Sequence, residues 1–337
     1  MKEDFAIIIG INDYTPKNNT GPKTLLGAIN DANKVEDWVS STTGGNVPPQ
    51  NIKKIISSPN PLKPFQVEID DAFLEIETTI KSNGGLAKRL YFYFAGHGLG
   101  ILESTVDTGL CLANWSERRR QAALSSELYK DYIKQYGYFE EIIFIVDCCR
   151  NTKISITPQQ PTFRSPVPGL AAGQTKMFVA YATQYQDQSY EVESVDSEMR
   201  GAFTTVLLEG LKGAASNNGI IGADDLRDYL QMETPKIAQQ NGYKQIPEIY
   251  HNFTYNESLF GAPVVKININ FIFASTRNNP VVLMDGNLNV IETYDASKNK
   301  NITRQLEKSL YVLFDTISLE NKKFQVPMLN NENNVNF

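Results

Sequence analysis

The sequence predicts an α/β fold in which helices cover both faces of a mainly parallel sheet. Short apolar runs, rich in Ile, Val, Phe and Tyr, indicate strands that are buried on both faces; they lie at residues 5–9, 90–95, 142–146 and 177–182, with a weaker run at residues 52–56. Between and after these runs, apolar residues recur at helical spacing. This pattern predicts helices at residues 28–39, 65–80, 124–136, 202–211 and 223–232.

The last part of the chain has a different pattern of predicted secondary structure, with strands and turns in place of alternating strands and helices. Strands are predicted at residues 264–274, 281–294 and 310–319, separated by Asn-rich turns such as Asp285-Gly286-Asn287. We therefore predict a large domain over residues 1–261 and a small β-rich domain over residues 262–337, whose Asn-rich tail from Asn330 is expected to be disordered. Within the large domain, residues 151–173 are rich in Pro, Ser and Thr, which predicts a flexible, exposed loop.

Composition excludes several classes of function. The formal net charge is −6 and the only dense basic run, Arg118 to Arg120, is short, so nucleic acid is not an expected partner. No apolar stretch approaches the roughly 20 residues that span a bilayer, which predicts a soluble protein without a membrane partner. Three cysteines, two of them adjacent, make no disulfide framework and favour a reducing, cytoplasmic compartment.

Two residues with reactive side chains follow predicted strands. His97 comes directly after the strand at 90–95, and Cys149 follows the strand at 142–146. Because the carboxyl ends of parallel strands meet at one edge of the sheet, the two side chains can face each other there. A thiol needs a base to become a thiolate near neutral pH, and an imidazole is suited to that task. Glycines flank His97, and the amides of Gly98 and Cys149 are candidate donors to an oxyanion.

At this point the chain resembles the caspase-like cysteine peptidases in their prokaryotic form, with metacaspases and paracaspases as relatives. The resemblance rests on six motifs that occur in the family's order over roughly residues 5–250: Gly10-Ile11-Asn12-Asp13-Tyr14, Leu26-Gly27-Ala28-Ile29-Asn30-Asp31-Ala32, Gly96-His97-Gly98, Asp147-Cys148-Cys149-Arg150-Asn151, Tyr181-Ala182-Thr183 and Gly201-Ala202-Phe203-Thr204. It implies a three-layer caspase-like fold for residues 1–261. It also implies a cysteine endopeptidase with Cys149 as nucleophile and His97 as base.

The resemblance also selects between neighbouring residues. The family's nucleophile stands two positions after an acidic or amide residue and directly before Arg or His, which selects Cys149 and leaves Cys148 to core packing. Side chains that alternate along an extended chain point the two sulfurs in opposite directions, in agreement with that choice. No third member of a catalytic triad is visible. The second histidine, His251, lacks flanking glycines and is interpreted as structural.

Substrate preference follows from the same motifs. Proteins of this family that carry Asp two residues before the nucleophile resemble one another in cleaving after Arg or Lys, and this chain has Asp147. Asp31 and Glu191 match the other acidic positions of the pocket, and a buried cationic side chain requires such partners. Two alternatives stay open: Asp31 as an acidic residue that only stabilises its helix, and Asp187 in place of Glu191.

No cofactor is expected. The histidines and cysteines lack the paired spacing of zinc sites, and the acidic residues form no loop with calcium-site spacing, so calcium activation has no motif behind it. Lys153, Arg164 and Lys176 lie in or beside the predicted loop and suggest self-cleavage of a precursor, and the Arg118 to Arg120 run is a further basic segment that such a protease could cut.

The sequence leaves two hypotheses for the function. The first is an endopeptidase that cleaves after Arg or Lys. The resemblance implies for it an effector role in bacterial stress, antiviral defence or cell death, in which it activates a partner such as a pore-forming protein. The second is a scaffold in which catalysis is incidental and the C-terminal domain provides the interaction.

Overall fold

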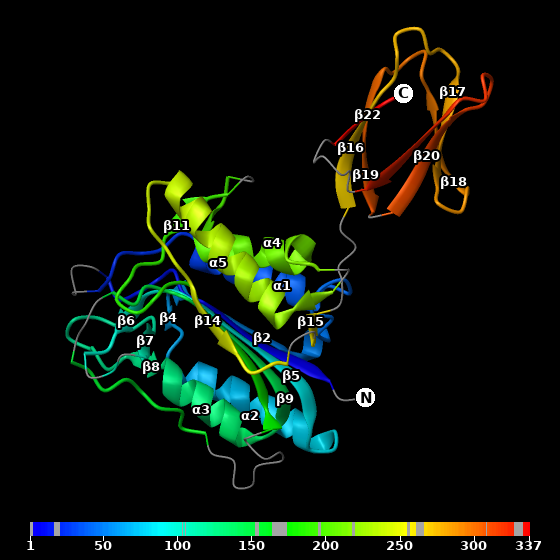
Figure 1. Ribbon diagram of the computed structural model, residues 1–337. Helices are drawn as coiled ribbons and strands as arrows, with labels where there is room; N and C mark the ends of the chain where they lie inside the picture. The colour runs from blue at the N-terminus through cyan, green and yellow to red at the C-terminus, as the bar shows by residue number, and fades with distance from the viewer. Residues whose placement is uncertain are drawn as a thin grey trace. The chain divides into compact units, whose positions relative to one another are not determined.

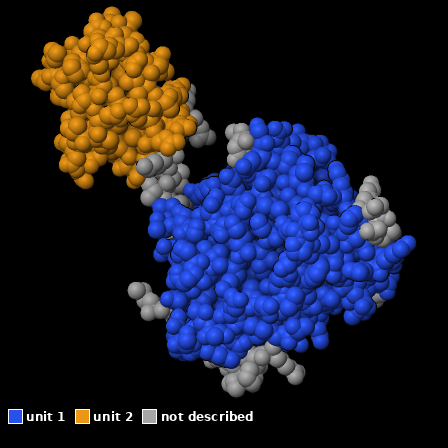
Figure 2. All heavy atoms as spheres, turned by 180° about the vertical axis from the view of Figure 1, so that it is seen from behind, with its two compact units in different colours: residues 1–262 blue, residues 263–337 orange. Residues whose placement is uncertain are grey.

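The computed structural model describes residues 3–16, 21–102, 104, 106–151, 155–163, 174–194, 197–217, 220–254, 257–260, 266–307, 309–326 and 333–337. The chain divides into two compact units, Met1–Ala262 and Pro263–Phe337, which Figure 2 shows in different colours. The sequence predicts the boundary after residue 261, one residue before the observed division. Each unit has an apolar core of its own.

A six-stranded sheet forms the centre of the first unit (Figure 1). In spatial order its strands are β14 (Glu248–His251), β10 (Lys176–Tyr181), β9 (Phe139–Asp147), β5 (Ala87–Ala95), β1 (Asp4–Gly10) and β2 (Ile52–Ile56). All neighbouring pairs are parallel except β10 and β14. The predicted parallel sheet is therefore confirmed, and the antiparallel β14 is an edge strand.

Five helices cover the two faces of this sheet: α1 (Ala28–Ser40), α2 (Gln66–Ser82), α3 (Ser126–Tyr136), α4 (Ala202–Glu209) and α5 (Ala223–Gln240). The apolar side chains of α2 and α3 share a core with Ile7, Ile9 and Phe92, whereas those of α1, α4 and α5 share one with Ile8 and Tyr93. Since successive strand residues point to opposite faces, one apolar run supplies both cores. The result is the predicted three-layer fold.

All five helices differ from the prediction at one end or at both, four of them by one or two residues. The helix predicted from residue 124 begins at Ser126, because residues 123–125 form a strand and the Ser125 hydroxyl accepts a bond of 3.0 Å from the amide of Leu128 as an N-cap. The helix predicted to end at residue 232 continues through Pro235 to Gln240.

Several strands of only two to four residues were not predicted, because such short segments show no periodic pattern. The most relevant is an antiparallel sheet of β6 (Gly98–Gly100), β7 (Thr108–Cys111) and β8 (Ala123–Ser125), which follows directly on His97. The other short elements are β3 (Ser58–Pro59) with β4 (Leu62–Lys63), β11 (Glu191–Glu193) with β12 (Met199–Gly201), β13 (Ile221–Gly222) with β15 (Ser258–Phe260), the 3-10 turn Pro49–Asn51 and the π-helical turn Gly210–Ala214.

Part of the predicted flexible loop is held against the core. Gln159 pairs with β8, since its amide donates to Ala123 O at 2.7 Å and its carbonyl accepts from the amide of Ser125 at 3.0 Å. Phe163 is buried and its ring lies 4.6 Å from that of Phe73, centroid to centroid. The proline-rich composition did not indicate this anchoring, because one aromatic residue and two backbone bonds produce it.

The second unit is a β-sandwich. One sheet holds β19 (Asn301–Glu307), β16 (Lys266–Ile272) and β22 (Asn334–Asn336), and the other holds β18 (Val290–Asp295), β17 (Pro280–Asp285), β20 (Ser309–Asp315) and β21 (Asn321–Val326). The strand predicted at 281–294 is two strands joined by the predicted turn at Gly286. The expectation of a disordered tail is wrong for residues 333–337, since β22 pairs in parallel with β16 and Val335 is buried.

Candidate active site

The register of the central sheet brings the two predicted catalytic residues to the same level. Gly10 of β1 pairs with Ala95 of β5, and Ala95 pairs with Asp147 of β9. His97 and Cys149 each stand two residues beyond that row. A Cβ atom on Gly98 would overlap Cys148 Sγ and the Cys149 carbonyl oxygen, so only glycine permits this close approach of the two loops.

A cavity of about 600 Å³ opens at this edge of the sheet. It is lined by five of the six predicted catalytic, oxyanion and substrate-binding residues, all except Gly98, and by neighbours from several segments. The lining residues are Lys23, Thr24, Leu25, Leu26, Ala28, Asp31, Ala95, Gly96, His97, Asp147, Cys148, Cys149, Gln188, Ser189, Tyr190, Glu191, Met199, Gly201 and Tyr243. The alternative acidic residue, Asp187, does not line it. The cavity combines a thiol, an imidazole and three carboxylates.

The imidazole of His97 is oriented by a main-chain oxygen. Its Nε2 lies 2.6 Å from the carbonyl oxygen of Lys23. Because a carbonyl oxygen can only accept, Nε2 carries the proton of the neutral ring, and Nδ1 is left as the acceptor. Burial lowers the pKa of His97 below its ordinary value of 6.5, although the Lys23 bond acts in the opposite direction. The sequence analysis found no third member of a triad, because a main-chain oxygen has no residue signature.

The two adjacent thiols have different surroundings. Cys148 is buried with 2% of its surface exposed, whereas Cys149 is partly exposed at the cavity and its Sγ donates to Ser189 O at 3.3 Å. Burial raises the pKa of the Cys149 thiol above its ordinary value of 9.0, and the nearby carboxylates of Asp147 and Glu191 act in the same direction. At neutral pH the thiol and the imidazole are therefore both uncharged.

Two buried carboxylates form the end of the cavity nearest to Gly201. Asp147 accepts bonds from Ser189 Oγ at 2.6 Å and from Thr204 Oγ1 at 2.7 Å, and Asp31 Oδ2 accepts from the Gly201 amide at 2.8 Å. Asp31 Oδ1 is buried and has no hydrogen-bond partner. Burial raises the pKa of both carboxyl groups, and the charge of Asp147 raises that of Asp31 further. A buried, unpaired carboxylate oxygen favours a cationic ligand.

Glu191 lies differently from the other two acids. Its carboxylate accepts bonds from the backbone amides of Leu26 and Gly27, which precede α1. Gly27 leaves the space for this contact, since a Cβ there would be 2.9 Å from Glu191 Oε1. The negative charge is thus placed on the free amides at a helix N-terminus, where it is stabilised. Glu191 lines the cavity and also ties β11 to α1.

Two substitutions distinguish these roles of Glu191. Glu191→Gln keeps an acceptor oxygen for the amides, so we expect kcat/KM for an Arg-containing peptide to stay within about threefold of wild type. Glu191→Ala loses the acceptor and is expected to lower the free energy of unfolding by about 1 kcal/mol. Urea unfolding and peptide hydrolysis measure the two effects. If Glu191→Gln reduces kcat/KM as strongly as Asp147→Asn, the side chain is a substrate ligand instead.

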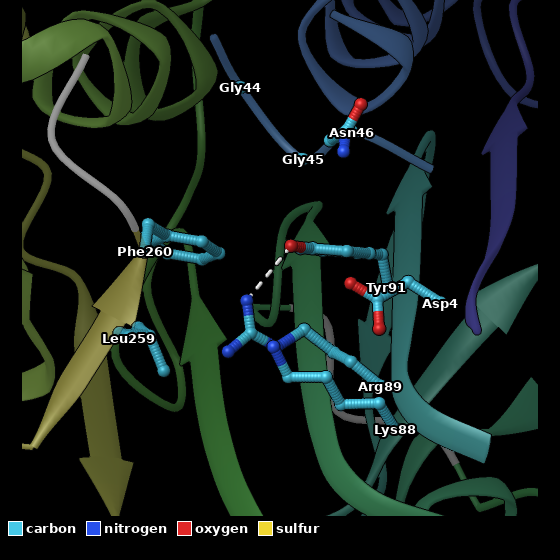
Figure 3. Close-up of a pocket in the computed structure, with 9 residues that line it drawn as sticks. All are labelled: Asp4, Gly44, Gly45, Asn46, Lys88, Arg89, Tyr91, Leu259 and Phe260. Carbon is cyan, nitrogen blue, oxygen red and sulfur yellow. Dashed lines mark hydrogen bonds between the residues drawn. The ribbon is translucent and has the colours of Figure 1, made fainter. Parts of the chain in front are cut away.

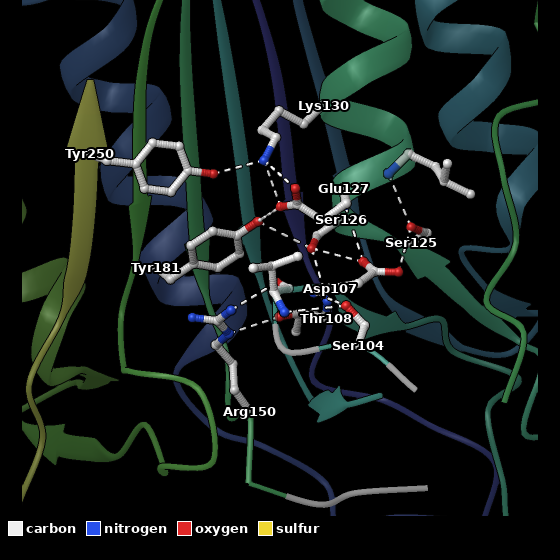
Figure 4. Close-up of polar contacts among 12 residues, drawn as sticks. Ser104, Asp107, Thr108, Ser125, Ser126, Glu127, Lys130, Arg150, Tyr181 and Tyr250 are labelled. Carbon is white, nitrogen blue, oxygen red and sulfur yellow. Dashed lines mark hydrogen bonds and ion pairs between the residues drawn. The ribbon is translucent and has the colours of Figure 1, made fainter. Parts of the chain in front are cut away.

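The residue after the thiol, Arg150, is almost completely buried and fixes the end of the Cys149 loop (Figure 4). Its guanidinium donates to Thr108 Oγ1 and to Val106 O, each at 2.9 Å, and forms an ion pair with Glu248. It also lies 4.2 Å from the centroid of the Tyr181 ring. The hydroxyl of Tyr181 extends the network to Glu127 of α3, which pairs with Lys130. Arg150 therefore links the loop to β7, β10 and β14.

A second cavity, of about 370 Å³, lies at the opposite edge of the sheet, where β1 and β5 begin (Figure 3). Its main charged group is Arg89, which donates to Tyr91 Oη at 3.0 Å and pairs with Glu141. The guanidinium also lies 5.1 Å from the centroid of the Phe260 ring. The described residues that line this cavity include no cysteine or histidine.

The remaining candidate residues lie away from this cavity. His251 is on β14, with Nε2 3.4 Å from Asp224 Oδ1 and its ring stacked near Phe178, as a structural residue would be. The Arg118 to Arg120 run is an exposed turn between β7 and β8. Lys153 and Arg164 lie outside the described residues. Lys176 is the first residue of β10 and pairs with Glu257, so it is not in a loop.

Two further features of the described residues bear on function. Across the described segments, no three His, Cys, Asp or Glu side chains are arranged to hold a metal ion. In the same part of the chain, no helix is both long and apolar enough to cross a membrane.

Comparison with known families assigns the chain to one class by its fold. The caspase domain of peptidase family C14 matches residues 3–256, so the chain belongs to the caspase-domain family. A curated relative from a Desulfuromonadales bacterium, described as a probable protease, is 29% identical over 241 residues. That match covers 68% of this chain and 28% of the relative, so the chain spans less than a third of the relative's length. The family and this relative support a peptidase.

Two solved structures align with parts of the chain. A structural-genomics protein from Geobacter sulfurreducens has 14% sequence identity and a TM-score of 0.47, covering 77% of this chain and 99% of that one. A second structure, titled only as that of a protease, has 11% identity and a TM-score of 0.33, covering 95% of this chain and 67% of that one.

Proposed function

We propose that this protein is a cysteine endopeptidase that cleaves after Arg or Lys, with Cys149 as nucleophile and His97 as base. The single observation that carries the proposal is the cavity beyond β5 and β9, where a partly exposed thiol, an oriented imidazole and two buried carboxylates meet. A peptidase needs the first two groups for acyl transfer. A substrate cation accounts for the other two, including the unpaired oxygen of Asp31.

The proposed reaction has two halves. His97 Nδ1 takes the proton of the Cys149 thiol as the sulfur attacks the carbonyl carbon, and the amides of Gly98 and Cys149 donate to the oxyanion. The C–N bond then breaks, and His97 gives its proton to the leaving amine, which produces a thioester. In the second half His97 deprotonates a water molecule, the water attacks the thioester, and the Cys149 thiol is regenerated with release of the acid. The Lys23 carbonyl holds the imidazole throughout.

Covalent labelling tests this function directly. A peptidyl-Arg chloromethyl ketone is expected to alkylate Cys149 with loss of HCl. The mass of the intact protein should then rise by the mass of one inhibitor molecule less that of HCl. The matched Asp compound should react more slowly by at least about 100-fold, because it brings a negative charge to buried carboxylates. Labelling of Cys148, or equal rates for the two compounds, would reject the proposal.

The pH dependence of hydrolysis follows from the two reacting groups. His97 must be unprotonated to act as base, so kcat should fall as the pH drops through its lowered pKa, below 6.5. The thiol pKa is raised above 9.0, so the neutral pair persists up to that pH. We expect a plateau of kcat between about pH 6.5 and 9, while protonation of Asp31, whose pKa is raised by burial, should increase KM in acid. A kcat that rises steadily to pH 9 would contradict this assignment.

We further propose that the natural substrate is a partner protein activated by limited proteolysis, such as a pore-forming protein, in bacterial stress or antiviral defence. The support for this role is the resemblance to prokaryotic caspase-like proteases and the cavity that holds Cys149 beside two buried carboxylates. Mass spectrometry of new protein termini, in cells that produce wild type or Cys149→Ala, tests it. A few termini after Arg or Lys that depend on Cys149 are expected, and termini that appear equally with both proteins would refute it.

A further inference from the structure

The segment Gly10-Ile11-Asn12-Asp13-Tyr14 at the end of β1 has no role in the mechanism above, yet several hydrogen bonds hold it in place. The Gly10 carbonyl accepts from the Ser57 amide at 2.9 Å. The amides of Asn12 and Asp13 both donate to Ser57 Oγ, at 2.9 and 3.0 Å, and that hydroxyl donates to Asp13 Oδ2 at 2.9 Å. These bonds fix the direction in which the chain leaves the sheet, next to the loop that carries His97.

Tyr14 contacts His97 in two ways. Its hydroxyl oxygen accepts a bond of 2.7 Å from the His97 backbone amide, and its ring lies 4.9 Å from the imidazole, centroid to centroid, at an interplanar angle of 58°. Tyr14 is only 6% exposed. Gly96 leaves the space for this contact, because a Cβ there would lie 2.7 Å from the Tyr14 hydroxyl. Both the main chain and the ring of His97 therefore rest on one side chain.

The same segment also supports the other contact of the imidazole. The Asn12 carbonyl accepts from the Leu25 amide at 3.1 Å, and Asn12 Oδ1 accepts from the Ile29 amide at 3.1 Å. These bonds fix the chain on the C-terminal side of Lys23, whose carbonyl oxygen lies 2.6 Å from His97 Nε2. One short segment thus supports His97 from Tyr14 and from Lys23.

We propose that Tyr14 is a positioning residue that holds His97 in the orientation in which Nε2 donates to the Lys23 carbonyl and Nδ1 is free to accept. This inference takes one point from the proposed function, namely that His97 acts as the base. Without the hydroxyl, the His97 amide loses its acceptor and the loop can rotate, so the Lys23 bond and the single tautomer are lost together.

The test uses Tyr14→Phe, which keeps the ring and removes the hydroxyl. The control is Tyr136→Phe, since Tyr136 is also buried and its hydroxyl donates to Glu77 at 3.3 Å, near the start of β9 and away from the site. We expect Tyr14→Phe to lower kcat for a peptidyl-Arg reporter about tenfold while KM stays within about twofold, because the substrate-binding carboxylates are untouched. Tyr136→Phe should leave both constants unchanged, although both variants lower the melting temperature.

A second measurement needs no substrate. The chain has only two histidines, so the ¹⁵N spectrum of the imidazoles is readily assigned with a His251→Gln variant. Wild type should show His97 as the pure Nε2–H tautomer, and Tyr14→Phe should show a mixture. An unchanged kcat or an unchanged tautomer in Tyr14→Phe overturns the inference. If the wild-type protein does not cleave after Arg or Lys, the proposed function is wrong. The ¹⁵N spectra of wild type and Tyr14→Phe then still test, without an activity assay, whether Tyr14 positions His97.

Discussion

Replacing Cys149 with alanine is expected to lower kcat/KM for a peptidyl-Arg reporter by at least about 10⁴-fold, the size of effect that follows from loss of a nucleophile. The Cys149 thiol is partly exposed at the cavity, whereas Cys148 is buried, so the Cys149→Ala protein should fold normally. A continuous assay of the purified full chain measures the loss. A urea unfolding curve that matches wild type shows that the loss lies in the chemistry.

Cys148→Ala is the matched control for this substitution. Cys148 is buried against Gly98 and lies on the core side of the loop, so its replacement should cost some stability and leave most of the activity. The reverse pattern, with activity lost in Cys148→Ala and retained in Cys149→Ala, would contradict the assignment of the nucleophile.

The second large effect concerns the charge of the substrate. Asp147→Asn keeps the size of the side chain and an oxygen for Thr204, yet removes a buried negative charge from the cavity. We expect kcat/KM for Arg and Lys substrates to fall about 100- to 1,000-fold, because an ion pair with a desolvated partner is lost. Most of the change should appear in KM, which steady-state kinetics with Arg, Lys and uncharged reporters would show.

Asp187→Asn serves as the control for this variant. Asp187 was the alternative acidic residue of the same region, and it contributes its carbonyl oxygen, not its carboxylate, to the Arg150 amide. The substitution leaves that backbone bond in place and should change kcat/KM less than about twofold. If Asp187→Asn is the more damaging of the two, the assignment of the acidic cavity residues is wrong.

The sequence was sufficient to predict the central sheet and the position of the candidate site. The strands that end before His97 and Cys149 each contain an unbroken apolar run, residues 90–95 and 142–146, and such runs indicate which segments are buried in a parallel sheet. Parallel strands then require their carboxyl ends to share one edge. For these reasons pattern and topology predict that both residues lie at the same edge of the sheet, whereas the choice of Cys149 over Cys148 came from the family resemblance.

Other parts of the site carry no such pattern. Lys23 acts through its main-chain oxygen, which every residue possesses, and Ser189 and Thr204 reach Asp147 only because β10 and α4 pack against β9. The strands β6, β7 and β8 are too short for any periodicity to appear. The contact of Phe163 with its aromatic neighbours depends on a single side chain, and proline-rich surroundings hide it.

The position of Glu191 shows why residue type alone does not define a binding site. The sequence analysis placed it in one pocket with Asp31 and Asp147, and left Asp187 open as its alternative. In the structure its carboxylate accepts from two backbone amides, whereas Asp31 keeps one buried oxygen without a partner. A cationic side chain therefore gains more from Asp31 and Asp147, and the contribution of Glu191 is to hold β11 against α1.

The most direct test of the central claim is the cleavage profile of the purified protein on an unbiased peptide library, with every new terminus mapped by mass spectrometry. The account predicts cuts after Arg and Lys, absent from the Cys149→Ala protein under the same conditions. Cuts after Asp, cuts without preference at the residue before the scissile bond, or cuts that persist in Cys149→Ala would contradict it.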